Sequence, residues 1–404
     1  MGYSGMNLES VKAQNRSSIL RSLNDHGAMS RKDLSEQLGL TPASVTTLCS
    51  ELLEEGMLRE LGEMSTAKRA GRRKILLDIN DRYRYVLSVS IETPTTCVSL
   101  CTLRGERLGV KRLQTDSWTP PEVLLRKIAD ECKLLMWENE IQREQLLGAG
   151  VSLPGPVDRQ TGTSIHAYRI WEQPVQVVKL LEQWLECPVL LENNVKAFAQ
   201  AELIFGVGRQ QENLLLLKWG PGVGSAIITQ NRIYESDTYK TAEIGHVRVE
   251  PGGELCRCGR RGCLETRVAS HPLVRHLRTV CDPTLAPGLW NAAHGDPAKI
   301  TVHDLDVMAA LDDAAVWKIL DEDIETLANV VGGFLTMLAP DRLILYGSMF
   351  ALPHFLEHFL AACRRYDPAY DESYIRMSAL NEKIEFIGPL AVVVEELFYH
   401  ERTI

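Results

Sequence analysis

Apolar residues recur every three or four positions in the first 60 residues, and this pattern predicts three short helices. The second helix should begin at Ser30, which offers an N-cap with Asp33 three residues on, and should end at Gly39. The third should begin at Thr41, because an N-cap threonine followed by proline at the first helical position is a frequent helix start. The apolar face of this third helix consists of Val45, Leu48, Leu52 and Leu53.

The polar face of the third helix and the segment after it indicate DNA binding. Ser44, Thr46 and Thr47 are short hydrogen-bonding side chains that suit a helix lying against base edges and phosphates. Strands are predicted at 57–61 and 74–79, with a basic tip between them that would meet phosphates or the minor groove. The basic residues of the tip are Lys68, Arg69, Arg72 and Arg73. We therefore predict a winged helix-turn-helix; the alternative is an ordinary three-helix bundle with a charged loop.

From Tyr83 onward the pattern changes to strands alternating with helices. Strands are predicted at 85–91, 97–103, 107–113, 146–151, 189–191, 214–219, 223–229, 343–346 and 384–387, and helices at 123–137, 175–185, 316–338 and 355–363. The rough repetition of this order predicts two α/β lobes with a cleft between them, a place that ligands favour. The predicted domains are 1–80 for the winged helix, 81–195 with a C-terminal helix 389–404 for the first lobe, and 196–388 for the second.

Composition and charge narrow the class of protein. The 404 residues are 45% hydrophobic and carry a net charge of -9, which taken alone disfavours nucleic acid. Residues 1–80, however, hold 11 Lys and Arg against 10 Asp and Glu, so the acidity lies in the rest of the chain. No apolar run is long enough to span a bilayer, and no signal peptide is recognisable. We expect a cytoplasmic protein that does not contact membranes, and its ten cysteines indicate reduced thiols or a metal site.

One histidine and three cysteines have the spacing of a metal site. His246, Cys256, Cys258 and Cys263 fall within eighteen residues, and zinc prefers four nitrogen and sulfur ligands in a tetrahedron. Gly259 and Gly262 would let the chain fold back tightly around the ion. Because four protein ligands leave no open position for a reactive water, the predicted cofactor is a structural Zn²⁺. The alternative is a group of buried or redox-active cysteines.

Several motifs together resemble the ROK family of repressors, open reading frames and sugar kinases. The motifs are Gly-Val-Ser-Leu-Pro-Gly-Pro-Val-Asp at 150–158, Glu-Ile-Gly-His at 243–246, the cysteine stretch with the Leu-Glu that follows it, and Ala-Ala-His-Gly-Asp-Pro at 292–297. The likeness runs from about Tyr83 to the C terminus, and the winged helix is similar to that of the family's repressor branch. The resemblance implies an actin-like, hexokinase-like pair of lobes with a sugar in the cleft.

The resemblance also implies a set of ligand residues. Sugar hydroxyls would be met by Asn193, Asn194, Glu243, His246 and Glu265. Carboxylates, amides and imidazole can each donate to or accept from hydroxyls, and His246 would bind zinc through one ring nitrogen and a hydroxyl through the other. The alternatives are solvated or capping acids for the two glutamates and a turn-forming role for the two asparagines.

Departures from the kinase branch predict that phosphorylation is lost. Asn194 stands where kinases of this family carry an aspartate that acts as general base, and an amide cannot take up that proton. Glu92 and Thr93 replace a glycine pair of the first phosphate loop, and Pro221 replaces the usual threonine of the second. The predicted function is therefore a DNA-binding regulator rather than an enzyme.

We expect a repressor of carbohydrate genes that binds a double-stranded DNA operator and a sugar or sugar-phosphate effector. An operator with two-fold symmetry requires two DNA-binding domains, so at least a homodimer, or a tetramer, is expected. Two alternatives are an active sugar kinase with a DNA-binding domain and a regulator that is controlled by a protein partner.

Overall fold

The first helices form where the sequence supplies their caps. The computed structural model describes residues 8–63, 75–210, 212–236, 241–311 and 313–400. Ser30 and Asp33 form the predicted capping box, and Gly39 ends that helix in the left-handed region at φ 65°. Thr41 caps the next helix by accepting a hydrogen bond from the backbone N–H of Ser44. These two caps fix the tight turn between the second and third helices.

Three helices and a three-stranded sheet form the predicted winged helix-turn-helix. The elements are α1 (Leu8–His26), β1 (Met29–Ser30), α2 (Arg31–Leu38), α3 (Pro42–Glu54), β2 (Leu58–Glu63) and β3 (Ile75–Ile79), and the strand order is β1-β3-β2. Ile19, Leu34, Val45 and Leu48 are buried and hold the three helices together. The predicted fold of this domain is confirmed.

The chain divides into two compact units. Unit 1 comprises residues 1–205 and 385–404, and unit 2 comprises residues 206–384. The lobe boundaries predicted at 195 and 388 stay predictions; the units divide within ten residues of the first and within four of the second. The difference arises because α6 (Asn194–Phe205) and α13 (Ile387–Val393) pack on each other and on the sheet of unit 1.

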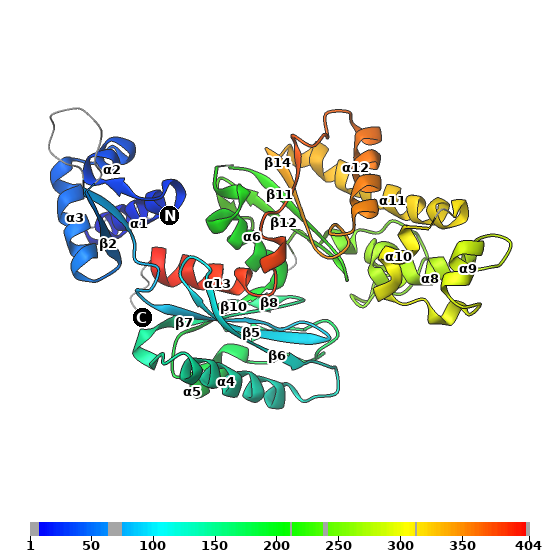
Figure 1. Ribbon diagram of the computed structural model, residues 1–404, viewed down its shortest axis with the longest axis horizontal. Helices are drawn as coiled ribbons and strands as arrows, with labels where there is room; N and C mark the ends of the chain where they lie inside the picture. The colour runs from blue at the N-terminus through cyan, green and yellow to red at the C-terminus, as the bar shows by residue number, and fades with distance from the viewer. Residues whose placement is uncertain (1–7, 64–74, 211, 237–240, 312, 401–404) are drawn as a thin grey trace. The chain divides into compact units, whose positions relative to one another are not determined.

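The sheet of unit 1 has the order β10-β7-β4-β5-β6. Its strands are β4 (Tyr85–Ser90), β5 (Thr95–Thr102), β6 (Arg107–Gln114), β7 (Leu146–Leu153) and β10 (Val189–Asn193). Figure 1 shows α4 (Pro121–Glu138) and α5 (Val177–Leu185) on one face of this sheet and α13 on the other. Smaller elements of this unit are a 3₁₀ turn at Arg143–Gln145, β8 (Val157–Asp158), β9 (Thr163–Ser164) and a π-helical turn at Val394–Tyr399.

The sheet of unit 2 has the order β13-β12-β11-β14-β15. Its strands are β11 (Leu214–Trp219), β12 (Val223–Thr229), β13 (Arg232–Ile233), β14 (Arg342–Tyr346) and β15 (Ile375–Met377). Its α-helices are α7 (Glu265–Val268), α8 (Ser270–Val280), α9 (Pro287–Ala292), α10 (Leu305–Ala309), α11 (Ala314–Leu338) and α12 (Pro353–Tyr366). The 3₁₀ turns are Val207–Gln210, Ile244–His246, Pro297–Lys299, Val302–Asp304 and Asn381–Lys383.

The two sheets share one topology. In each, an antiparallel three-stranded meander (β4-β5-β6 or β11-β12-β13) pairs through its first strand with a parallel strand, β7 or β14, which pairs with a second parallel strand, β10 or β15. This repetition confirms the two α/β lobes predicted from the sequence. It also places β10 and β15 at equivalent edges.

The secondary structure differs from the prediction in several places, and the helices α7, α8, α9 and α10 of unit 2 were not predicted. The strand predicted at 384–387 is wrong, because residues 384–386 form a turn and Ile387 begins α13, while β15 supplies the outer strand. A short apolar run does not distinguish a strand from a buried helix, and α13 is buried throughout. The sequence analysis also missed α6, whose start at Asn194 follows β10 without a connecting loop.

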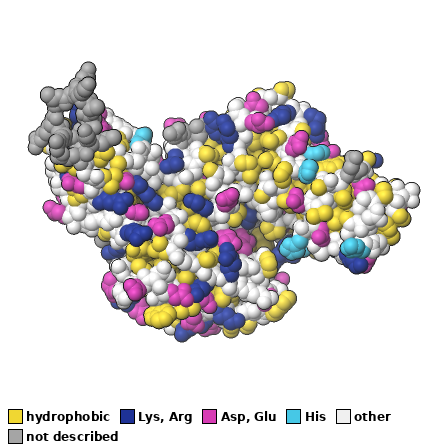
Figure 2. All heavy atoms as spheres, viewed as in Figure 1, with side chains coloured by type: hydrophobic (Ala, Val, Ile, Leu, Met, Phe, Trp, Pro, Cys, Tyr) yellow, Lys and Arg dark blue, Asp and Glu magenta, His cyan; other side chains and the backbone are white. Residues whose placement is uncertain are grey.

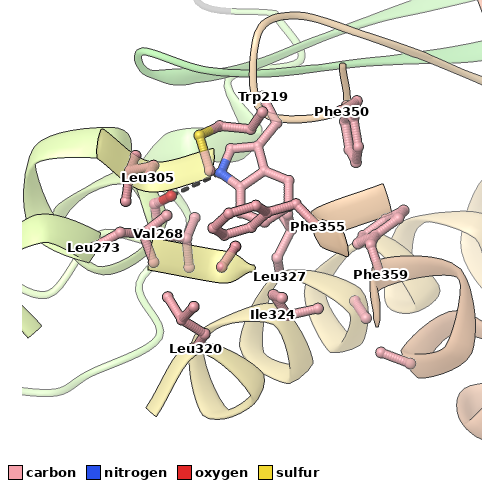
Figure 3. Packing of buried hydrophobic residues seen from close by; sticks show 14 of the residues in the cluster. Trp219, Val268, Leu273, Leu305, Leu320, Ile324, Leu327, Phe350, Phe355 and Phe359 are labelled. Carbon is pink, nitrogen blue, oxygen red and sulfur yellow. Dashed lines mark hydrogen bonds between the residues drawn. The ribbon is translucent and has the colours of Figure 1, made fainter. Parts of the chain in front are cut away.

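The core of unit 2 is centred on Trp219, the last residue of β11. Its ring packs edge-on against Phe350 and Phe355, with centroids 5.3 and 5.7 Å away, and the indole N–H donates to the carbonyl oxygen of Val268 at 2.7 Å (Figure 3). The hydrogen bond joins the end of β11 to α7 inside the core. Glu265, a candidate site residue, begins α7, so this core holds it in place relative to the sheet of unit 2.

The surface carries charges of both signs. Figure 2 shows Lys and Arg side chains interspersed with Asp and Glu side chains on the viewed face. Among the described residues, no helix combines the length and apolar character that crossing a bilayer requires.

Candidate functional site

The exposed face of α3 carries the three residues predicted to read DNA. Ser44, Thr46 and Thr47 are all exposed. The hydroxyl of Thr46 donates to the carbonyl oxygen of Pro42 at 2.7 Å, and that of Thr47 donates to Ala43 at 3.1 Å. Each of these hydroxyl hydrogens is thus used within the helix, so the oxygens can act only as acceptors toward DNA, which suits the amino groups of adenine and cytosine, and a threonine methyl group suits the methyl group of thymine. The predicted basic tip, with Lys68, Arg69, Arg72 and Arg73, lies outside the described residues.

His246, Cys256, Cys258 and Cys263 come together as one cluster, with a ligand atom from each within 4.8 Å of the others. The Cys258 and Cys263 sulfur atoms are 3.7 Å apart, and the Cys256 sulfur is 3.5 Å from His246 Nδ1. A tetrahedral ion with bonds of about 2.3 Å to sulfur and about 2.0 Å to nitrogen separates such pairs by roughly 3.8 and 3.5 Å. The four side chains therefore fit one tetrahedral metal ion.

The backbone around the cluster depends on Gly262. Gly262 has φ 71°, and a Cβ there would lie 1.6 Å from the carbonyl oxygen of Glu250. Only glycine allows these two backbone segments to meet, which confirms the tight fold predicted from the sequence. Burial raises the pKa of the Cys256 thiol to about 12. Burial also raises the pKa of Cys258, but hydrogen bonds from Arg260 outweigh this effect and hold it below its ordinary value.

The two ring nitrogens of His246 face different partners. Nδ1 faces the cysteine cluster, whereas Nε2 lies 3.7 Å from a carboxylate oxygen of Glu243. A metal bound at Nδ1 would leave Nε2 protonated, with its N–H directed toward the side of Glu243. The metal would thus fix both the tautomer and the orientation of this imidazole.

Glu265 lies beside the loop that follows β11. Its carboxylate accepts a hydrogen bond from the backbone N–H of Val223 at 3.3 Å, and a Cβ on Gly222 would lie 2.9 Å from the same oxygen. Glu265 begins α7, which the hydrogen bond from Trp219 to Val268 secures (Figure 3). His246 therefore lies in the cysteine cluster, and Glu265 lies at the start of a helix that is anchored in the core of unit 2.

In unit 1, Asn193 and Asn194 have different surroundings. The amide oxygen of Asn193 accepts from the backbone N–H groups of Val195 and Lys196 at 2.9 and 3.2 Å, and its amide nitrogen donates to Gly155 at 3.0 Å. Asn193 thus caps α6, and it can offer a ligand only its second amide hydrogen. This cap was the signal for α6 that the sequence analysis overlooked.

Asn194 is the first residue of α6 and contacts Glu92. Its amide nitrogen donates to a carboxylate oxygen of Glu92 at 2.5 Å. Glu92 belongs to the segment after β4 where the sequence lacks the glycine pair of a phosphate loop. The structure therefore brings together Asn194 and Glu92, two residues that the sequence analysis interpreted separately as departures from a kinase.

Removing a cluster ligand should remove the metal. We expect the purified protein to contain one divalent ion per chain and Cys258→Ser to contain none, as measured by plasma mass spectrometry. Loss of the ion should lower the melting temperature by at least about 5 °C, since each kcal/mol shifts a domain of this size by about 2–4 °C. Cys281→Ser, at a buried cysteine outside the cluster, should keep the metal. Full metal occupancy in Cys258→Ser would contradict this assignment.

Comparison with known proteins agrees with both parts of the fold. Residues 87–392 match the ROK family, and residues 13–59 match a winged helix-turn-helix DNA-binding family. The chain is 30% identical over 269 residues to the DNA-binding transcriptional dual regulator NagC of Escherichia coli, an alignment that covers 65% of this chain and 64% of NagC. It is 23% identical over 394 residues to the xylose repressor of Caldicellulosiruptor bescii, covering 96% and 97% of the two chains.

Solved structures show the same fold. A ROK family transcriptional regulator described as a homologue of the Escherichia coli MLC protein superposes with a TM-score of 0.79 at 20% identity, covering 96% of this chain and 97% of that one. A ROK family glucokinase from Streptomyces griseus, in complex with glucose and AMPPNP, gives a TM-score of 0.63 at 21% identity and covers 76% and 98%. Since the family match spans residues 87–392, the chain belongs to the ROK family.

Proposed function

We propose that this protein is a sugar-responsive repressor of carbohydrate-metabolism genes. The winged helix binds an operator, and the ROK domain binds a sugar or sugar phosphate without phosphorylating it. The contact between Asn194 and Glu92 in a chain that also carries a DNA-binding domain is the observation on which this proposal rests. The names of the relatives, which include an N-acetylglucosamine repressor and xylose repressors, support the same class of function.

The loss of kinase activity has two physical causes. Phosphoryl transfer to a sugar hydroxyl needs a base, and proton transfer of this kind contributes about 10²–10⁴-fold to a rate. Asn194 is an amide and cannot accept the proton. Glu92 places a negative charge where a phosphate would approach the chain, and its hydrogen bond to Asn194 holds the carboxylate there. Binding of hydroxyl groups does not need either function.

Hydroxyl recognition is assigned to Asn193, Asn194, Glu243, His246 and Glu265. Asn193 would contribute one amide hydrogen, Asn194 its amide oxygen, and the two carboxylates would act as acceptors. The metal is inferred to be zinc, because three thiolates and an imidazole in a tetrahedron match its preference. Its role would be structural, holding His246 so that Nε2 can donate to a hydroxyl.

The assembly is proposed to be a homodimer or a tetramer. Repressors of this type read two half-sites related by two-fold symmetry, and one winged helix contacts one half-site. The basic tip at Lys68, Arg69, Arg72 and Arg73 would add phosphate contacts that carry affinity without sequence information.

Removing a hydroxyl from α3 should weaken operator binding. Thr47→Val keeps the shape of the side chain, and we expect affinity for a duplex selected from random DNA to fall about 5–150-fold, corresponding to roughly 1–3 kcal/mol for a good base contact. Thr326→Val is the matched control, because Thr326 makes the same hydrogen bond to the carbonyl four residues earlier but lies on α11. Equal affinities of the two variants in fluorescence anisotropy would contradict a reading role for α3.

A sugar effector should stabilise the folded protein. We expect one of glucose, xylose, N-acetylglucosamine or their phosphates to raise the melting temperature of the metal-loaded protein and to change its affinity for the selected duplex. Asn194→Ala should abolish the shift, whereas Asn291→Ala, at an exposed position of α9, should keep it. If no sugar shifts the melting temperature and a protein partner alone releases DNA, the effector is that partner.

ATP should have no effect. We expect no sugar-dependent ADP formation above background and no change of melting temperature with ATP, because the base is absent and Glu92 repels phosphate. A coupled assay with each sugar of the panel tests this. ATP turnover that requires a sugar and disappears in Glu243→Ala would show that the protein is still a kinase.

A further inference from the structure

A buried carboxylate adjoins the proposed effector residues. Glu192 is 2% exposed and immediately precedes Asn193 and Asn194 in β10. One of its carboxylate oxygens accepts from the backbone N–H of Asn193 at 2.7 Å, and the other lies 3.2 Å from Nε of Arg159. A displacement of the turn that carries the two asparagines therefore acts directly on this ion pair.

Arg159 joins Glu192 to the C-terminal segment of the chain. While its Nε faces Glu192, its Nη2 donates to a carboxylate oxygen of Glu396 at 2.9 Å. A guanidinium is planar and rigid, so two carboxylates bound through different nitrogens are held at a fixed separation. The π-helical turn Val394–Tyr399 is thereby tied to the end of β10.

The same helical turn contacts the winged helix. Glu395 accepts a hydrogen bond from Nη2 of Arg21 at 2.7 Å, and the Arg21 guanidinium lies 4.7 Å from the centre of the Tyr399 ring. Arg21 belongs to α1 of the DNA-binding domain. Because Glu395 and Glu396 are consecutive, one turn of the backbone receives both arginines.

A second contact leads from the effector residues to α1 by way of α6. This helix begins at Asn194, and near its other end the carbonyl oxygen of Ile204 accepts from the amide nitrogen of Asn24 at 2.8 Å. Along its length α6 packs closely on α13, where a Cβ on Gly388 would lie 3.1 Å from the backbone of Ala197. Arg21 and Asn24 are one helical turn apart on α1, so both contacts reach the same part of it.

We propose that Arg159 is a positioning residue that transmits effector occupancy at Asn194 to the DNA-binding domain, through Glu396 and the turn that also binds Arg21. This inference rests on the function proposed above. An effector changes DNA affinity only as far as it favours one arrangement of the protein over another. The ion pairs supply the connection through which a change at the end of β10 alters how α1 is held.

Glu396→Gln tests the connection with little disturbance of the fold. The substitution keeps the size of the side chain and leaves the pair between Glu192 and Arg159 intact. The measured quantity is the coupling factor, the ratio of affinities for the selected duplex without and with the sugar that stabilises the wild type; such factors are typically about 5–150. We expect the factor to fall toward 1, while sugar affinity measured calorimetrically without DNA stays within about twofold of wild type.

A matched control and a second variant complete the test. Glu385→Gln loses an ion pair with Arg112 elsewhere in unit 1 and should keep the wild-type factor. Arg21→Gln removes the partner of Glu395 and should lower the factor as Glu396→Gln does. In the double variant the two losses should not add, because both interrupt one connection.

The outcomes separate the two proposals. If the wild type responds to no sugar of the panel, the effector function fails and this inference fails with it. If the wild type responds and Glu396→Gln and Arg21→Gln keep its coupling factor, the effector function stands and the role of Arg159 is overturned. A lower melting temperature with an unchanged factor would show a purely structural ion pair and would equally overturn it.

Discussion

The hydrogen bonds by which Asn193 ends β10 and caps α6 determine the geometry of unit 1 around the candidate site. A helix that starts without a connecting loop leaves backbone N–H groups exposed, and the Asn193 amide oxygen accepts two of them. This cap places Asn194 in the first turn of α6, where its side chain meets Glu92. It also directs α6 along α13, so the ligand-side residue and the C-terminal segment belong to one packed layer. A displacement of this turn would therefore displace the whole of α6.

The two units share one sheet topology but carry different candidate site residues. Both units have the same five-stranded sheet, yet unit 1 carries the two asparagines and Glu92, whereas unit 2 carries the cluster of one histidine and three cysteines with Glu243 and Glu265. The segment that holds the metal ligands has few apolar side chains, and Leu255 within it is 64% exposed. A metal ion can fix such a segment where a hydrophobic core cannot. The core around Trp219 then joins that segment to the sheet through α7.

Local signals in the sequence were sufficient for much of the structure. Caps at Ser30 and Thr41 gave the winged helix, and the spacing of one histidine and three cysteines gave the cluster, because each signal lies within a few residues. The strand predicted at 384–387 failed because a short apolar run carries no period, and only packing decides between strand and buried helix. Contacts such as that of Arg159 with Glu396 join residues 237 positions apart, so no local sequence pattern predicts them.

The relative strengths of the Glu192–Arg159 and Arg21–Glu395 ion pairs indicate which contact of the proposed connection can rearrange. The arginines of the two pairs are equally exposed, at 36% for Arg159 and 38% for Arg21, and the pairs differ in their carboxylates, since Glu192 is 3% exposed and Glu395 15%. Moving Arg159 away would leave the Glu192 charge buried without its partner, which in buried pairs costs about 3–5 kcal/mol and exceeds the roughly 1–3 kcal/mol that couples two binding sites in allosteric proteins. The inner pair would therefore stay intact and move as a unit. The carboxylate of the pair between Arg21 and Glu395 is less buried than Glu192, so this pair lies nearer to exposed ion pairs, which contribute about 0–1 kcal/mol each. An effector can supply enough free energy to rearrange this outer contact, so the change should occur where the C-terminal turn holds the DNA-binding domain.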